Sequence, residues 1–213
     1  MKESFPAQLE AWYEKAEQIS PVRLRTLTRK KLIDYLGLYG FTNGAEIGVD
    51  RGRFSKYMFE HIPNLHLYCV DLWWWKFRGE SKYQSVLRRL KDCNTTILRK
   101  TSLEALDDVP DGSLDFVYID ADHTFDYVMT DIILWSKKVR EGGIVAGHDY
   151  YRFRRAGVIP AVDIYTQQHG ITQWFLTDEK EATWFWAKGS SFVDPLPDSQ
   201  ESVQESAQQD LEE

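Results

Sequence analysis

The sequence predicts one α/β domain built on a mostly parallel sheet with helices on both faces. From Gly44 onward, short apolar runs alternate with helix-length segments, which is the spacing of repeated strand–helix–strand units. The runs are continuous rather than alternating in polarity, as expected for strands that are covered on both faces. They comprise residues 45–49, 65–71, 95–98, 114–119 and 144–147.

Other elements flank these strands at both ends of the chain. Two helices are expected before the first strand, over residues 5–18 and 22–37, because Leu24, Leu27 and Ile33 recur at roughly helical spacing. After the last parallel strand, residues 171–176 and 183–187 are separated by too few residues for a crossover helix. They should form an antiparallel hairpin at one edge of the sheet.

Length and composition limit the class of protein. A chain of 213 residues that is 43% hydrophobic and 14% aromatic is large enough for one buried core and is not a disordered chain. No apolar run approaches the roughly 20 residues that span a bilayer, and the N-terminus lacks the basic and apolar parts of a signal peptide. We therefore expect a cytoplasmic protein without membrane contact, in which Cys69 and Cys93 are reduced.

The net charge of −7 is carried by the C-terminal segment. Without that segment the numbers of acidic and basic residues are equal, so there is no electrostatic case for nucleic-acid binding. Residues 194–213 are rich in Ser, Gln and acids and are expected to form an acidic, disordered tail. The acids concerned are Asp194, Asp198, Glu201, Glu205, Asp210, Glu212 and Glu213.

The first informative motif follows the first strand. Residues 44–55 contain Glu46, Gly48 and Gly52 in the pattern E-x-G-x-x-x-G, and Ser55 lies in the helix that follows. Glycines at such a turn let backbone amides approach a ligand, and the helix N-terminus favours an anionic group. An ordinary tight turn explains the same residues equally well, and the spacing is not the dinucleotide pattern G-x-G-x-x-G.

A second motif is the acid that ends the next strand. Asp71 lies 23 residues beyond Gly48, where a carboxylate can accept hydrogen bonds from both hydroxyls of a ribose. A helix cap or a loop salt bridge is the alternative, but the position favours a nucleoside cofactor. The aromatic run Trp73–Trp75 follows it, and either caps an aromatic or sugar-like acceptor or forms a packed loop or dimer contact.

Two later strands also end in polar side chains. Asp120 and His123 follow one strand, and His148 and Asp149 follow the next. Because the carboxyl ends of parallel strands face one crevice, these groups could converge there. Oxygen ligands with one imidazole suit Mg²⁺, Mn²⁺ or iron, whereas caps and turns are the structural alternative.

Together these motifs resemble the S-adenosylmethionine-dependent methyltransferases of the Rossmann-like seven-stranded class. The resemblance covers about residues 40–190 and is most specific to small-molecule O-methyltransferases of the catechol and macrolide-sugar types. It implies a seven-stranded sheet of order 3-2-1-4-5-7-6 whose last strand is antiparallel. The matching segments are residues 46–52, 70–71, 119–123, 142–143 and 147–150.

The resemblance also implies roles for individual residues. Asp120 and His123 are the expected catalytic residues, with His123 as the base, and Asp120, His148 and Asp149 are the expected metal ligands. Those enzymes commonly have Asp-Asn or Glu-Asp where this chain has His148-Asp149, so the identity of a metal, and the need for one, stay open. The cofactor-binding residues implied are Glu46, Gly48, Gly52, Ser55, Asp71, Ser102 and Asp120.

The resulting expectation is a methyltransferase domain over residues 1–193, with N-terminal helices in 1–40 and the core in 41–190. It should transfer a methyl group from S-adenosylmethionine to a hydroxyl oxygen of a sugar- or phenol-like small molecule, assisted or not by Mg²⁺ or another divalent ion, as a monomer or homodimer. The alternatives are an inactive protein that binds S-adenosylmethionine and, less favoured, a dinucleotide-dependent oxidoreductase.

Overall fold

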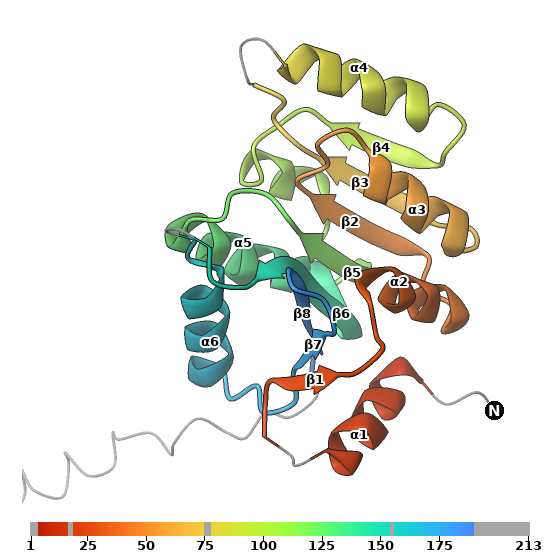
Figure 1. The fold of residues 1–213 in the computed structure, drawn as a ribbon. Coiled ribbons are helices and arrows are strands. Elements are labelled where there is room, and N and C mark those ends of the chain that lie inside the picture. Colours follow the sequence, from red (N-terminus) through yellow and green to blue (C-terminus); the bar gives the residue numbers. More distant parts are fainter. Residues whose placement is uncertain (1–3, 17–18, 75–77, 154–155, 190–213) are drawn as a thin grey trace, which may run out of the picture.

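The computed structural model describes residues 4–16, 19–74, 78–153 and 156–189, and within them one eight-stranded sheet is flanked by helices (Figure 1). The order of the strands is β1-β7-β8-β6-β5-β2-β3-β4. The expected acidic tail at 194–213 and Trp75 lie outside the described residues. The strands are β1 (Val22–Leu24), β2 (Asn43–Ile47), β3 (His66–Val70), β4 (Thr95–Leu98), β5 (Leu114–Ile119), β6 (Val139–Tyr150), β7 (Phe175–Thr177) and β8 (Ala182–Ala187).

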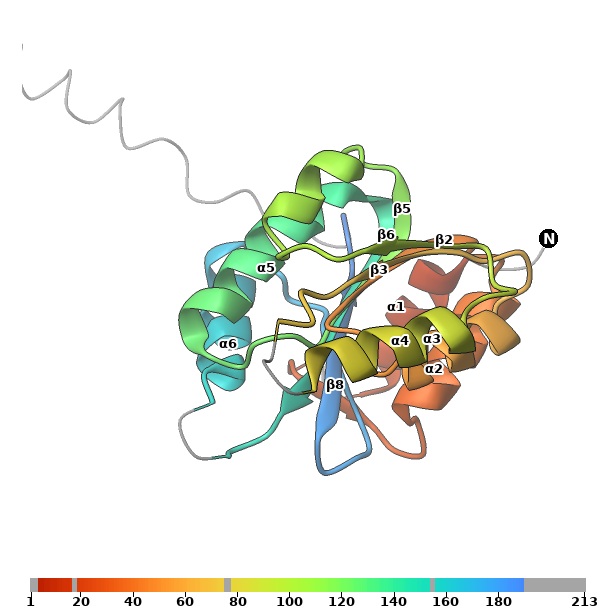
Figure 2. The same ribbon diagram turned by 90° about the horizontal axis from the view of Figure 1, so that it is seen from above.

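The helices form a layer on each face of the sheet, as Figure 2 shows from above. On one face, α1 to α4 pack over a core that includes Leu32, Met58 and Val86. On the other face, α5 and α6 pack over a second core, which includes Ile132 and Trp135. The helices are α1 (Phe5–Lys15), α2 (Arg29–Leu38), α3 (Arg53–His61), α4 (Gly79–Arg89), α5 (Phe125–Lys138) and α6 (Val158–Gln168), with a 3₁₀ turn, η1 (Glu104–Asp108).

The predicted topology is confirmed. Strands β4, β3, β2, β5, β6, β8 and β7 follow one another in the expected order 3-2-1-4-5-7-6, and the last strand, β8, is antiparallel to both β6 and β7. Every side chain of β8 is buried, which agrees with its continuous apolar sequence. The carboxyl ends of β2, β3, β4, β5 and β6 therefore lie along one edge of the sheet, because these strands are mutually parallel.

The N-terminal region differs from the expectation. The helix predicted over residues 22–37 begins only at Arg29, and residues Val22–Leu24 form β1, which pairs in parallel with β7. Strand β1 is therefore the edge strand, and the β7–β8 hairpin lies one strand further inside than predicted. The reason is tertiary pairing: three residues that fit a helical pattern gain backbone hydrogen bonds from the exposed side of β7.

Cys69 and Cys93 form no disulfide bond with each other, and the Cys69 side chain is buried. Among the described residues, none of the helices combines the length and the apolar character needed to cross a bilayer.

Candidate functional site

A cavity of about 720 Å³ opens at the carboxyl ends of the parallel strands. It receives residues from the ends of β2, β3, β4 and β5 and from the start of α5, which is where ligands bind in open α/β sheets. The residues that line it include Gly48, Asp71, Thr101, Ser102, Asp120, Asp122, His123, Tyr127 and Asp131. Five residues expected at the site from the sequence, Gly48, Asp71, Ser102, Asp120 and His123, are thus brought together.

The glycine-containing turn between β2 and α3 forms one wall. Gly48 has a φ of +96°, and a Cβ at this position would lie 2.0 Å from the backbone oxygen of Asp120. Gly52 has a φ of +68° and caps the N-terminus of α3. Gly48 is required because the ends of β2 and β5 approach so closely, and this approach brings the turn against the cavity.

Asp71 connects this turn to the loop after β3. Its Oδ2 accepts hydrogen bonds from the backbone amides of Val49 at 3.1 Å and Asp50 at 2.9 Å, and its Oδ1 accepts one from Trp73 at 2.9 Å. A carboxylate has about four acceptor positions, so one position remains for a ligand hydroxyl. Asp71 therefore both orders the turn and faces the cavity, and its contact with a ribose stays a prediction.

Glu46 and Ser55 are not among the residues that line the cavity. Both side chains are buried, and the Ser55 hydroxyl donates a short hydrogen bond to Oε2 of Glu46. Burial raises the pKa of Glu46 to about 8, so this carboxyl group is neutral around pH 7. Neither residue lines the cavity, so their predicted contact with the cofactor stays a prediction.

Asp131 is a cavity residue that the sequence analysis missed. It lies on α5 and is 2% exposed, and burial raises the pKa of its carboxyl group to about 6 while a hydrogen bond with Ser102 opposes the rise. The signal was present, because Val128, Asp131, Ile132 and Trp135 form one apolar stripe that an acid interrupts. A buried acid on such a stripe indicates a polar partner.

Four polar side chains meet beside the cavity at the ends of β5 and β6. His123 Nε2 lies 2.8 Å from Asp149 Oδ2 and 3.5 Å from Asp120 Oδ1. His148 Nδ1 lies 3.2 Å from Asp149 Oδ1 and 3.9 Å from Asp120 Oδ2. The predicted convergence of these residues is therefore observed, although the crossover helices and loops separate them in sequence.

The imidazolium of His123 offsets one of the two carboxylate charges in this cluster. Hydrogen bonds to Asp120 and Asp149 raise the pKa of His123 to about 10, so its imidazole is a cation at neutral pH. Burial alone would raise the pKa of Asp149, but the hydrogen bonds from His123 and His148 outweigh it and hold that pKa well below its usual range. The positive charge of His123 lies between the carboxylates of Asp120 and Asp149, a position that would also stabilise a cation.

The same cluster fits a divalent ion by donor chemistry. One atom each from Asp120, His123 and Asp149 lie within 4.8 Å of one another, and two carboxylates with an imidazole suit Mg²⁺, Mn²⁺ or iron. His148 contacts both carboxylates but is not a member of this group of three. Metal binding itself stays a prediction.

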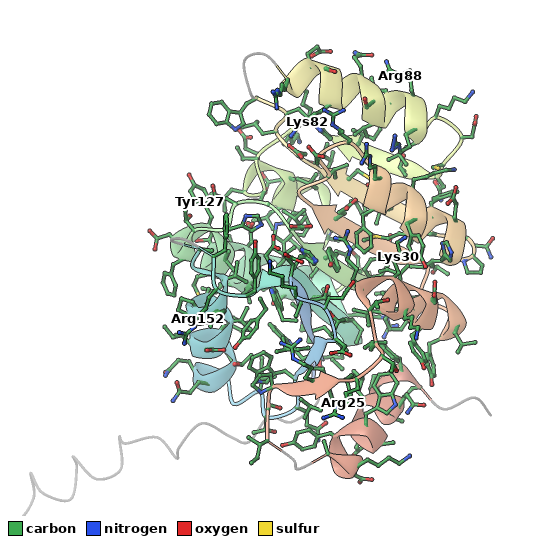
Figure 3. All side chains as sticks on the ribbon, in the orientation of Figure 1. Arg25, Lys30, Lys82, Arg88, Tyr127 and Arg152 are labelled. Carbon is green, nitrogen blue, oxygen red and sulfur yellow. The ribbon has the colours of Figure 1, made fainter. Side chains whose placement is uncertain are left out.

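Aromatic side chains border the cavity next to the cluster. Trp73 is 3% exposed and its indole N–H donates to the backbone oxygen of Asp50 at 2.8 Å, whereas Trp74 is 70% exposed. Tyr127, 58% exposed, projects from the first turn of α5 (Figure 3). Of the two described tryptophans of the aromatic run, Trp73 is therefore buried in the loop and Trp74 is exposed.

Comparison with known proteins agrees with this geometry. A family model described as "Methyltransferase domain" matches residues 45–150, which run from β2 through the cluster at the end of β6. The chain belongs to the Rossmann-like S-adenosylmethionine-dependent methyltransferases.

Solved structures share the fold of this methyltransferase at low sequence identity. An O-methyltransferase from Bacillus cereus in complex with S-adenosylhomocysteine is 13% identical, with a TM-score of 0.58 over 88% of this chain and 92% of that one. TomG from Streptomyces achromogenes, an O-methyltransferase involved in tomaymycin synthesis and solved with S-adenosylmethionine, is 14% identical, with a TM-score of 0.56 over 89% and 92%.

A curated protein with a related sequence is the uncharacterized protein y4gI from Sinorhizobium fredii, which is 27% identical over 162 residues. The match covers 59% of this chain and 18% of the relative, so the methyltransferase corresponds to a small part of that longer protein.

Proposed function

We propose that this methyltransferase transfers a methyl group from S-adenosylmethionine to a hydroxyl oxygen of a small molecule. The observation that carries the proposal is the position of Asp120, His123 and Asp149 at one side of the cofactor cavity. A hydroxyl is a poor nucleophile until it loses its proton, and this cluster combines carboxylates with a histidine at the place where an acceptor would meet the cofactor.

In the reaction, the acceptor oxygen forms a bond to the methyl carbon while the bond from that carbon to sulfur breaks. S-adenosylhomocysteine leaves with the bonding electron pair, and the hydroxyl proton passes to His123. The residues mainly supply orientation and proton removal, because the transfer requires the oxygen and the sulfonium methyl to be in line. His123 must first lose the proton that its two carboxylate neighbours stabilise.

We further propose that Asp120 and Asp149 hold a divalent ion. Bound there, such an ion lowers the pKa of a hydroxyl group in contact with it. With that positive charge beside Asp120 and Asp149, the pKa of His123 would be lower and its imidazole would be free to take the hydroxyl proton. Two carboxylates with the remaining positions open to water and acceptor are a usual arrangement for Mg²⁺.

Exposed aromatic side chains support a phenol- or sugar-like acceptor. Tyr127 lines the cavity and its side chain is largely exposed, so its ring can stack on the flat or apolar face of such a molecule. Trp74 also lines the cavity, whereas the buried Trp73 packs within the loop.

The test is a transfer assay with S-adenosylmethionine labelled in its methyl group and a panel of catechols, phenols and sugars. Two acids that follow β5 provide a matched pair. Asp120→Asn should abolish transfer, whereas Asp126→Asn should retain it, because Asp126 is exposed in the first turn of α5 and does not line the cavity.

Mass analysis of the product decides the atom that is methylated. A label on nitrogen or carbon would contradict hydroxyl transfer. Tight binding of S-adenosylmethionine with no labelled product over the whole panel would favour the alternative, a cofactor-binding protein without turnover.

A further inference from the structure

Arg29 reaches the catalytic cluster from the N-terminal part of the chain. It is the first residue of α2, and its backbone amide donates to Oε2 of Glu179, in the turn between β7 and β8, at 2.6 Å. Strand β1, which precedes it, is paired with β7. The position of Arg29 is therefore fixed by the unexpected edge strand.

The guanidinium group of Arg29 is stacked and directed at His148. Its Cζ lies 4.8 Å from the centre of the Phe54 ring, and its Nη1 lies 3.5 Å from Nε2 of His148. Among the residues that the structure describes, no carboxylate oxygen lies within 4.0 Å of this guanidinium. The guanidinium group is thus held by the Phe54 ring, by His148 and by the hydroxyl of Tyr118, which accepts a further hydrogen bond from it.

This contact determines which nitrogen of His148 carries the proton. An arginine side chain has only donors, so Nε2 of His148 must present its lone pair to Nη1. The proton then resides on Nδ1, which lies 3.2 Å from Oδ1 of Asp149 and donates to it. Both ring nitrogens of His148 are occupied in this way.

We propose that Arg29 is a positioning residue for the catalytic cluster, acting through His148, and that His148 is a hydrogen-bond donor to Asp149 in place of the metal ligand expected from the sequence. Asp149 then receives a hydrogen bond on each oxygen, from His148 on Oδ1 and from His123 on Oδ2. Its backbone has a φ of +59°, an unfavourable conformation for a residue other than glycine, which additional contacts must maintain.

The inference rests on the proposed function for its kinetic consequence, but its structural part can be measured independently. Nitrogen chemical shifts of histidine rings, recorded by NMR, report which ring nitrogen is protonated. In the unmodified protein, His148 should show a proton on Nδ1 and none on Nε2. A protonated Nε2 would overturn the proposal, whether or not an acceptor has been found.

A matched pair of variants tests the part played by Arg29. Arg29→Met and Lys30→Met remove the same charge from adjacent residues that each stack on a ring, but Lys30 lies over Tyr57, outside the cluster. Arg29→Met should allow both tautomers of the His148 ring, with the proton on either nitrogen, and Lys30→Met should leave its signals unchanged. Unchanged His148 signals in Arg29→Met would also overturn the proposal.

The affinity for S-adenosylmethionine separates positioning from loss of the fold. Arg29 does not line the cofactor cavity, so affinity in Arg29→Met should stay within about twofold of the unmodified protein. With an identified acceptor, kcat should fall by about tenfold while KM for S-adenosylmethionine stays unchanged. The reason is that a displaced Asp149 carboxylate disturbs the alignment of the reacting groups and not the binding of the cofactor. Should Arg29→Met not fold, Arg29→Gln, which keeps an N–H donor, should retain the Nδ1-protonated form of His148; loss of that form would contradict the proposal.

Discussion

His123 Nε2 lies 2.8 Å from Asp149 Oδ2, so the expected catalytic base forms an ion pair with an expected metal ligand. The two carboxylates hold a proton on His123, the group that would have to accept one in the proposed reaction. A divalent ion at Asp120 and Asp149 would compete with this proton for the same carboxylates, so binding of the ion would favour the basic form of His123.

The first prediction concerns the pH dependence of stability. The pKa of His123 is raised from 6.5 to about 10, so the stability it confers is fully present below pH 6.5 and is lost as the pH rises through about 10. Asp149→Asn should bring this pKa down and reduce the decline in Tm between pH 6.5 and 10. Thermal melts of metal-free protein and NMR titration of His123 measure both effects. An identical titration in the variant would contradict this electrostatic coupling.

The second prediction concerns metal dependence. Exhaustive chelation should suppress methyl transfer near pH 7, and added Mg²⁺ or Mn²⁺ should restore it. Asp149→Asn should be insensitive to either ion, whereas a variant that lacks only the base, His123→Ala, should bind the ion and react about 10² to 10⁴ times more slowly. Full activity of the unmodified enzyme after chelation would show that His123 acts without a metal.

The third prediction separates the two roles of Asp71. Asp71→Ala should weaken binding of S-adenosylmethionine by roughly ten- to a hundredfold, because charged hydrogen bonds are worth about 1.5–3 kcal/mol. Loss of a ribose contact and loss of order in the turn would both weaken cofactor binding in Asp71→Ala. Binding of S-adenosylhomocysteine should therefore also be compared with binding of its analogue that lacks the ribose 2′-hydroxyl. Calorimetry should show that removing this hydroxyl weakens binding to the unmodified protein but not to Asp71→Ala. Equal penalties in both would restrict Asp71 to ordering the turn through Val49, Asp50 and Trp73.

The fourth prediction concerns the buried acid Glu46. The unfolded chain releases the proton of Glu46 near pH 4.5, whereas the folded protein keeps it up to about pH 8, so folding becomes less favourable as the pH rises between these values. Glu46→Gln should remove this decline and should be relatively more stable at pH 8 than at pH 5. Denaturant unfolding at the two pH values measures the difference. A constant difference between the proteins would show that Glu46 is ionised in the folded state.

The sheet was predictable because its strands carry strong local signals. Continuous apolar runs such as 114–119 marked buried parallel strands, and the resemblance to a known family supplied their order. Strand β1 carried no such signal, since three residues with one charge fit a helix as well as a strand. Pairing with β7, some 150 residues away, decides its conformation.

The site was predictable where its residues follow strand ends. Asp71, Asp120, His123 and Asp149 were found because parallel strands align their carboxyl ends, whatever their separation in sequence. Arg29 was not found, because it is the first residue of α2 and follows β1, a strand that was not expected. The raised pKa of His123 likewise arises from two carboxylates on different strands, which no local pattern reveals.

The fifth prediction tests why the turn after β2 requires glycine. Gly48 and Gly40 both have positive φ, +96° and +78°, but only at Gly48 does an added Cβ meet other atoms, at 2.0 Å from the backbone oxygen of Asp120. Gly40→Ala should therefore cost only the backbone strain, about 1–3 kcal/mol.

Gly48→Ala should cost the same strain plus the displacement of β5 from β2, about 1–3 kcal/mol more. Because that displacement moves Asp120, the variant should also lose affinity for S-adenosylmethionine, whereas Gly40→Ala should keep it. Chemical denaturation and calorimetry on the two variants measure these differences. Equal losses of stability, with cofactor affinity intact in both, would mean that the strand ends tolerate a wider spacing and that the close approach of Gly48 to Asp120 does not shape the cavity.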